Sequence, residues 1–422
     1  MTTDLMIRGG SLVGGPTVDV AVDAGKISAV VPAGEGGSAS RSIDAAGLTL
    51  LPGAIDAHVH FDAPGRDEWE GWTSGSLAAA AGGVTTVVDM PIDSDPPTLD
   101  TTAVRDKQDV AHAQSIVDFA LWGGLTPQNT DRVEALLGSG VVGLKAFLCE
   151  SGWDSFAPCD ATSLGRGMAA AARAGRPVAV HCEDPAQFLS PRDRPVSSEV
   201  AAVALAGATA AAQGARLHVV HCSSADAALE AKLWPGTSVE TCPHYLTLDD
   251  SDAARIGPDA WCCPPLRDAT QRTRLVEAVH QGVIDCVASD HSPCPPAMKH
   301  GDAPFAGIAG VQTALSVLLA VEGLEMATAV RLRTAAARLL GLTSKGAVAP
   351  GFDADIVLFD PAATWTVRPE TLLTRHRRSP FMGMTMGGVV VATLVRGTVV
   401  YEGGRAAAPP LGRFVAPAAS AP

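Results

Sequence analysis

Apolar runs of strand length recur through most of the chain, and alanine-rich or amphipathic segments separate them. Eight such runs lie between residues 53 and 293: GAIDAHVH, VTTVVDMP, SIVDFALWGG, VVGLKAFL, PVAVHCED, RLHVVHCSS, SVETCPHYL and IDCVASDHSP. Strands that are apolar along their whole length are buried on both faces, as in parallel sheets covered by helices. Intervening segments such as SLGRGMAAAARAG predict the helices. The pattern indicates an α/β fold with eight β/α units, which predicts a (β/α)8 TIM barrel.

Both ends of the chain follow a different pattern, in which short alternating strands are separated by glycine turns. The first stretch includes MIRGGSLVGGPTVDVAVDAGKISAVVP, and the second runs from ADIVLFDP through VVVATLVRGTVVYEGG. We expect the two ends to pair into one small β-sandwich. The predicted domains are residues 1–51 as the N-terminal part of this sandwich, 52–345 as the barrel, and 346–422 as the C-terminal part plus an extended tail.

The composition narrows the class of protein and its partners. The 422 residues are 47% hydrophobic and 18% charged, which allows a large core. A formal net charge of −14 argues against nucleic acid or an anionic membrane as the partner. No apolar run reaches the roughly 18 residues that a membrane span needs. The nine cysteines have no paired spacing and no signal peptide is recognisable, so we expect reduced thiols in the cytoplasm.

Two histidines one residue apart end the first of the eight runs. His58 and His60 would point to the same side of a strand, because side chains alternate across it. Imidazole is the commonest metal ligand in proteins, so a converging pair indicates a metal site. A pair of buried histidines with ordinary hydrogen bonds is the alternative at this point.

Other polar side chains lie where later runs end, and the ends of parallel barrel strands form one rim. Together the candidate ligands are His58, His60, Lys145, His181, His221 and Asp290. This set exceeds the three ligands of one catalytic zinc and indicates two metals, which need a bridging anion between them. A neutral Lys145 can add carbon dioxide to give a carbamate with two oxygens. A buried lysine paired with a carboxylate is the alternative.

These residues and their surroundings resemble the cyclic amidohydrolases of the amidohydrolase superfamily, which include dihydroorotases, hydantoinases and allantoinases. HVHF, GLKAFL and SDHSP carry the resemblance, which covers nearly the whole chain, including APGFDADIVLFDP. It implies a binuclear centre with a carboxylated Lys145. One metal would be held by His58, His60, Lys145 and Asp290, and the other by Lys145, His181 and His221. Zinc is the expected ion, although cobalt, manganese and nickel suit the same ligands.

Several segments resemble allantoinases in particular, namely APGRDEWEGW, GLKAFLCESGWD, VETCPHYL, CCPPLRD and SDHSPCPPAMK. Asp62 stands where dihydroorotases typically have an arginine that binds a substrate carboxylate, and no tyrosine follows Lys145 as in hydantoinases. The resemblance therefore implies hydrolysis of allantoin to allantoate. Two segments depart from the pattern: DMPID has Asp93 in place of an asparagine, and PFAGIAG lacks the tryptophan of AWGGI.

The resemblance also suggests individual roles. Asp290 is the expected acid/base, because it would touch both the metal and the attacking water. The expected substrate contacts are Arg66, Asp93, His244, Cys263, Pro264 and Ser292. An enzyme for a hydantoin, a dihydropyrimidine or dihydroorotate is the nearer alternative, and a non-catalytic scaffold on the same fold is the more distant one. The family often forms homotetramers, so we expect a homo-oligomer.

Overall fold

The computed structural model describes residues 2–301 and 304–418. All eight apolar runs contain strands, and the third run contains two. These strands are β6 (Ala54–Val59), β7 (Val84–Asp89), β8 (Asp118–Leu121), β9 (Gly123–Gly124), β10 (Leu144–Phe147), β11 (Pro177–His181), β12 (Arg216–Val219), β13 (Thr237–Thr241) and β14 (Cys286–Val287). The predicted α/β class is therefore confirmed.

The strands of this part pair in parallel and in chain order. One sheet runs β6-β7-β8, and another runs from β14 through β13, β12, β11 and β10 to β9. The amide of Val142 donates to the carbonyl of Leu121 at 2.9 Å, which joins the two sheets beside β8. At the opposite edges, Val59 of β6 forms a parallel bridge with His291, just beyond β14. The carboxyl ends of the strands consequently face one side.

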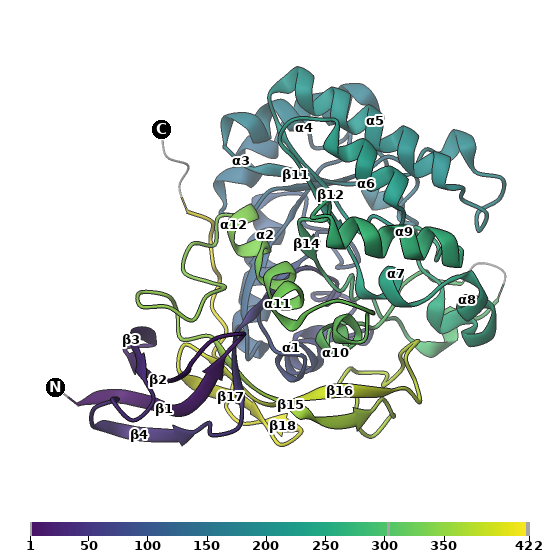
Figure 1. Ribbon diagram of the computed structural model, residues 1–422. Helices are drawn as coiled ribbons and strands as arrows, with labels where there is room; N and C mark the ends of the chain where they lie inside the picture. The colour runs from purple at the N-terminus through teal and green to yellow at the C-terminus, as the bar shows by residue number, and fades with distance from the viewer. Residues whose placement is uncertain (1, 302–303, 419–422) are drawn as a thin grey trace.

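Helices cover the outside of the parallel strands (Figure 1). They are α1 (Gly71–Ala81), α2 (Thr101–Gln114), α3 (Val133–Gly138), α4 (Ala161–Arg173), α5 (Val196–Gln213), α6 (Ala225–Lys232), α7 (Pro243–Thr247), α8 (Asp250–Ile256), α9 (Ala269–His280), α10 (Ala314–Leu319), α11 (Met326–Thr334) and α12 (Ala336–Leu339). Side chains of Asp100, Asp160 and Asp268 accept backbone N–H groups at the starts of α2, α4 and α9, which fixes where those helices begin. Among the described helices, none has both the length and the apolar character to cross a membrane.

Both chain ends contribute to one nine-stranded sheet, which lies below the helices in Figure 1. Its strands are β1 (Thr3–Leu12), β2 (Thr17–Asp23), β3 (Lys26–Pro32), β4 (Ala39–Asp44), β5 (Thr49–Pro52), β15 (Ile356–Thr366), β16 (Thr385–Val395), β17 (Thr398–Glu402) and β18 (Arg405–Ala406). β5 is the junction, because it pairs in parallel with β1 and antiparallel with β15. The predicted pairing of the two chain ends is therefore present.

The described tail after β18 is hydrogen-bonded to the parallel part of the fold. Phe119 of β8 donates its amide to the carbonyl of Arg413 at 2.9 Å and accepts from the amide of Val415 at 2.8 Å. Further on, Ala418 donates to the carbonyl of Gly341. Residues 419–422 of the predicted tail lie outside the described residues. The described tail thus adds contacts to the outside of β8.

Candidate metal centre and active site

The carboxyl ends of the parallel strands surround a cavity of about 740 Å³. All six predicted ligands line it: His58, His60, Lys145, His181, His221 and Asp290. Each of them is buried, with at most 8% of the residue exposed. The β/α pattern therefore brings together residues that lie as far apart in the chain as His58 and Asp290.

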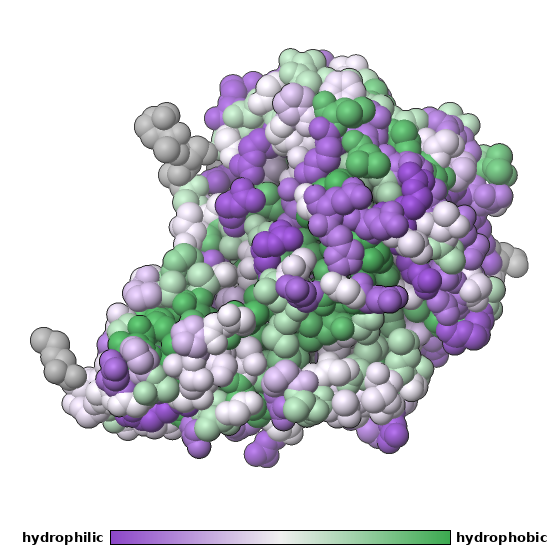
Figure 2. Space-filling view, viewed as in Figure 1, coloured by the Kyte–Doolittle hydropathy of each residue, from purple (hydrophilic) through white to green (hydrophobic). Residues whose placement is uncertain are grey.

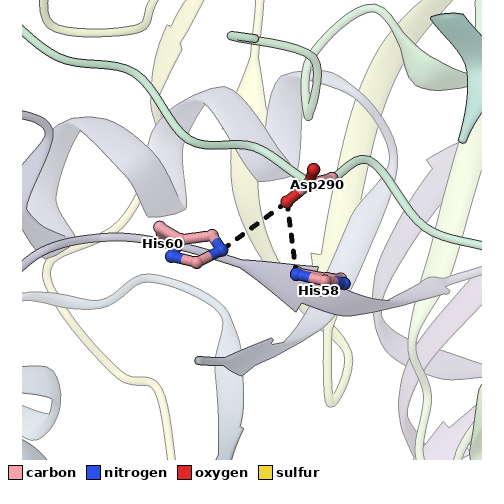
Figure 3. Close-up of side chains that lie close together, drawn as sticks. All are labelled: His58, His60 and Asp290. Atoms are coloured by element: carbon pink, nitrogen blue, oxygen red, sulfur yellow. Dashed lines mark ion pairs between the residues drawn. The ribbon is translucent and has the colours of Figure 1, made fainter. Parts of the chain in front are cut away.

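His58 on β6 and His60 just after this strand both face Asp290 (Figure 3). Oδ1 of Asp290 lies 3.2 Å from Nε2 of His58 and 3.5 Å from Nε2 of His60. Burial would raise the pKa of Asp290, but the neighbouring histidines hold it well below its ordinary value. The carboxylate is therefore an anion that two imidazoles face, which is a suitable ligand group for a divalent cation.

The second histidine pair faces the same cavity from β11 and from the segment just beyond β12. Nδ1 of His181 lies 3.0 Å from Nε2 of His221, and the two ring centroids are 4.6 Å apart. Burial lowers the pKa of both imidazoles. Neutral imidazoles with converging nitrogens can both donate lone pairs to a metal.

Three of the four histidines have a carboxylate behind the ring. Nδ1 of His58 lies 2.9 Å from Glu240, Nδ1 of His60 lies 2.7 Å from Asp93, and Nε2 of His181 lies 2.9 Å from Glu183. Such a carboxylate fixes the tautomer and the orientation of the ring, and leaves the other nitrogen free for a metal.

Sequence reasoning missed two of these carboxylates. Glu183 and Glu240 lie within the runs PVAVHCED and SVETCPHYL, where an acidic residue interrupts apolar strand positions. Both are fully buried, and Glu240 also accepts the amide of His221 at 3.2 Å. An acidic residue at such a position is costly unless it is paired, so this interruption was the signal that could have found them.

Lys145 enters the cavity from β10, where its Nζ lies 4.9 Å from the centroid of the Phe147 ring. Its Nζ is buried and forms no hydrogen bond with any residue that the structure describes, and no carboxylate pairs with it there. Burial lowers the pKa of Lys145 to about 8, although Asp290 and Glu240 oppose this shift. A neutral amine is therefore readily reached, and four imidazoles, one carboxylate and an unpaired amine suit a pair of divalent metals bridged by a carbamate.

The expected substrate contacts divide into two groups. Asp93, Cys263 and Ser292 line the cavity. The other three lie outside the lining that the described residues form: Arg66, His244 and Pro264. The carbonyl of Pro264 accepts the hydroxyl of Tyr245 at 2.6 Å, so this group already has a protein partner.

His244 lies on a helix, although it belongs to the strand-like run SVETCPHYL. It lies within α7, because Pro243 at the first helical position starts a short helix directly after β13. The side chain is buried, and its Nε2 has no hydrogen-bond partner among the described residues. A direct substrate contact of His244 therefore stays a prediction.

Aromatic and basic side chains form the outer wall of the cavity. Trp153, Trp261 and Phe305 line it together with Arg192 and Arg194. Phe305 belongs to PFAGIAG, the segment that lacks a tryptophan, and its ring packs at 5.0 Å against the ring of Trp69. An apolar wall with a few polar groups is typical of sites for small organic molecules.

The fold and this cavity define a class of protein, and a family comparison agrees with it. The sequence profile of the Amidohydrolase family matches residues 49–400, which include the whole lining of the cavity. The chain therefore belongs to the amidohydrolase family.

Individual relatives narrow the similarity further. The chain is 44% identical over 444 residues to the allantoinase of Rubrobacter xylanophilus, with 98% of each chain covered. It is 36% identical over 436 residues to the allantoinase of Escherichia coli K12, covering 95% of this chain and 96% of the relative. Among solved structures, the L-hydantoinase (dihydropyrimidinase) from Arthrobacter aurescens matches with a TM-score of 0.92 at 30% identity, covering 98% of this chain and 100% of that chain.

Proposed function

We propose that this protein hydrolyses the ring of allantoin to give allantoate, a reaction of purine degradation. The observation that carries the proposal is the similarity to allantoinases, which extends over nearly the full length of both chains at 36–44% identity. The cavity adds support, because all six expected ligands line it and no position of that set has been replaced. A scaffold protein without catalysis would have no reason to keep this buried set, in which the Nζ of Lys145 has no hydrogen-bond partner among the described residues.

Two divalent metal ions, with zinc as the first choice, would be held by these residues. His58, His60 and Asp290 would hold one ion, His181 and His221 would hold the other, and a carboxylated Lys145 would bridge them. The unpaired, buried Nζ of Lys145 supports this arrangement, since a carbamate would give it the partners that it lacks. When bound, the ions would supply Lewis-acid activation of the amide carbonyl and of the attacking water.

Asp290 would carry the proton through the reaction. Its carboxylate is anionic and faces the cavity, so it can take a proton from the attacking water as the C–O bond forms. It would then return this proton to the ring nitrogen as the C–N bond breaks. The other cavity groups would orient the ring: Ser292 and Cys263 line the cavity and offer backbone groups to alternating N–H and C=O groups.

A hydantoin or a dihydropyrimidine is the second candidate substrate. The structural match to the L-hydantoinase (dihydropyrimidinase) from Arthrobacter aurescens favours it, although the 30% identity is lower than the identity to the allantoinases. Product analysis tests the choice. Wild-type protein reconstituted with zinc should convert allantoin to allantoate, whereas ring opening of a 5-substituted hydantoin without any allantoate would overturn the proposal.

We also propose that the parallel strands form one closed eight-stranded barrel, and that residues 1–51 and 346–422 form a separate sandwich domain beside it. The bridge between Val59 and His291 supports closure, because it joins the outer edges of the two parallel sheets. The shared nine-stranded sheet supports the discontinuous domain. Limited proteolysis that releases residues 52–345 as a stable unit would support this division.

A cytoplasmic homotetramer is the proposed state of the protein. Leu205 of α5 and Leu229 and Leu233 at α6 are 45%, 47% and 71% exposed, which is unusual for leucine. Figure 2 shows this helical face covered largely by hydrophilic side chains with hydrophobic ones between them. All nine cysteines are unpaired thiols, which suits a reducing compartment. Light scattering at several concentrations measures the mass, and a monomer throughout would contradict the tetramer.

A further inference from the structure

Asp93 has a different partner on each oxygen of its carboxylate. Oδ2 lies 2.7 Å from Nδ1 of His60, and Oδ1 accepts the indole N–H of Trp153 at 2.6 Å. The residue follows β7, is only 6% exposed, and has a φ of +72°, in the left-handed region. Non-glycine residues rarely adopt this conformation, and aspartate is one of the few that tolerate it. The backbone is therefore held in a conformation that directs the carboxylate between the two rings.

The indole of Trp153 belongs to the wall of the cavity, and it contacts Arg66 as well as Asp93. The guanidinium of Arg66 lies 4.0 Å from the centroid of the Trp153 ring. The same guanidinium donates to the main-chain carbonyl of Asp93 at 2.8 Å. The loops that follow β6, β7 and β10 consequently meet at Asp93.

The chemistry of this contact requires a carboxylate. Ionised aspartate accepts hydrogen bonds on both oxygens, whereas an asparagine has one accepting oxygen and a donating amide. An asparagine at position 93 could turn its single accepting oxygen toward His60 or toward Trp153, and its amide NH2 would then face the other ring nitrogen. An aspartate there lets one side chain hold both donors.

We propose that Asp93 is a positioning residue that joins the wall of the cavity to the metal centre. The ion-pair contact of Asp93 with Nδ1 of His60 directs Nε2 of that ring into the cavity, and the hydrogen bond that Asp93 accepts from Trp153 ties this orientation to the position of the wall. Release of Trp153 therefore loosens the metal at His60 without any direct contact between the two rings. The inference rests on the proposed function in one respect, namely that His60 holds a metal.

Zinc affinity measured by competition with a chromophoric chelator tests the inference. Asp93→Ala should weaken binding at one of the two sites by about 10- to 100-fold, and Asp93→Asn should weaken it less. Trp153→Phe keeps an aromatic wall but removes the N–H donor, so it should weaken the same site by a smaller factor. That effect of Trp153→Phe should vanish when Asp93 is already alanine.

Trp234→Phe is the matched control. The indole of Trp234 also donates to a carboxylate, that of Glu230 at 3.1 Å, but both residues lie at α6, away from the cavity lining. This variant should bind zinc as the wild type does. Circular dichroism of each variant separates weakened binding from misfolding, and Asp93→Asn and Trp153→Phe keep the test open if Asp93→Ala does not fold.

The outcomes separate this inference from the proposed function. Wild-type zinc affinity in Asp93→Ala would overturn the positioning role. A weakened Asp93→Ala together with an unaffected Trp153→Phe would overturn the link to the wall. Allantoin turnover does not enter these titrations, so a protein that fails to open allantoin yet shows the coupled zinc affinities overturns the substrate assignment alone.

Discussion

Asp290 carries the largest share of the proposed chemistry at the scale of single residues. It faces His58 and His60 and is held as an anion, which is the state that an acceptor of the water proton needs. Asp290→Asn keeps the size of the side chain but removes this proton acceptor. We expect kcat to fall by about 10²-fold or more, since general acid/base groups contribute factors of that order.

Steady-state kinetics with zinc content measured on the same sample checks this expectation. Asp226→Asn serves as the control, because Asp226 of α6 forms a partly exposed ion pair with Arg274 of α9, and it should leave kcat nearly unchanged. Near-normal turnover by Asp290→Asn with full zinc content would contradict the assigned role.

Lys145 is the second test at this scale. If it bridges two ions as a carbamate, then Lys145→Ala removes the anion that lets the two cations lie close together. We expect the variant to lose most of the zinc from both sites, and to lose turnover with it. Metal analysis after gel filtration gives the zinc equivalents per chain. Retention of two equivalents by Lys145→Ala would show that this lysine is no bridging ligand.

Single residues were predictable from the sequence where they interrupt a pattern. Five of the six expected ligands stand at or just beyond the ends of apolar runs, whereas Lys145 interrupts its run and is the second residue of β10 instead of the last. The structure brings all six to one cavity, although their ligand roles stay predictions. The carboxylates behind the rings were harder to predict, because Glu240 contacts His58 across 182 positions of sequence. The sequence shows Asp93 as a departure from the DMPLN-like pattern, but it does not predict its partners His60 and Trp153, because these lie on other loops whose positions depend on the whole fold.

At the scale of elements, the loop after β6 is held in place by a close approach of its backbone to Asp95. Gly65 has a φ of +95°, and a Cβ at this position would lie 2.3 Å from the carbonyl oxygen of Asp95. The loop also carries Arg66, which bonds to Asp93. Gly65→Ala should therefore displace the loop and lower stability by more than the about 1–2 kcal/mol that left-handed backbone alone costs.

Gly34→Ala provides the matched comparison for urea unfolding. Gly34 has a similar φ of +87°, but nothing lies within 4 Å of the added Cβ. The difference between their losses in the free energy of unfolding measures the cost of the steric clash at residue 65, because the cost of the left-handed backbone is common to both variants. Equal losses of stability would contradict the view that Asp95 restricts this loop.

Strands with a clear hydrophobic pattern were predicted well from the sequence, whereas short elements and breaks within a strand were not. The apolar runs predicted every strand from β6 to β14, but the third run is divided into β8 and β9 around Trp122, whose indole donates to the carbonyl of Ala57. α7 was missed because a helix of five residues has too few positions to show a period.

At the scale of the whole molecule, the buried Lys345 joins the parallel strands to the terminal sheet. Nζ of Lys345 lies 2.5 Å from Asp118 of β8 and 2.8 Å from Asp355, just before β15. Lys345→Met leaves the buried Asp355 without its cation and leaves Asp118 with Arg396 as its remaining cationic partner. We expect a loss of about 3–5 kcal/mol in the free energy of unfolding, as for other broken buried ion pairs. Urea unfolding at neutral pH measures it.

Lys26→Met is the control for this variant, because Lys26 pairs with Asp353 while its side chain is 53% exposed, and it should cost less than about 1 kcal/mol.

The pH dependence of the stability that Lys345 contributes has a definite sign. Burial opposes the charge of Lys345, but Asp355 and Asp118 raise its pKa above the ordinary value. Its contribution is therefore complete below about pH 10, where unfolded lysine is charged, and declines only as the pH rises further. A Lys345→Met penalty that disappears at neutral pH would contradict this account.

The order of strands in the terminal sheet was beyond sequence reasoning, although the pairing of the two chain ends was predicted. β5 pairs with β15 across about 300 residues, with Leu50 opposite Leu358. Alternating patterns show that strands have a buried face, but they do not say which neighbour each strand chooses. Only the packing of the complete chain decides this order.

The comparison of kcat/KM among cyclic amides tests the central claim most directly. Purified wild-type protein, loaded with zinc and checked for two equivalents per chain, would be assayed with allantoin, a 5-substituted hydantoin, dihydrouracil and dihydroorotate. We predict that allantoin gives the highest value by at least about tenfold, a difference of about 1.4 kcal/mol in transition-state binding. A higher kcat/KM for any of the other three rings would contradict the assignment.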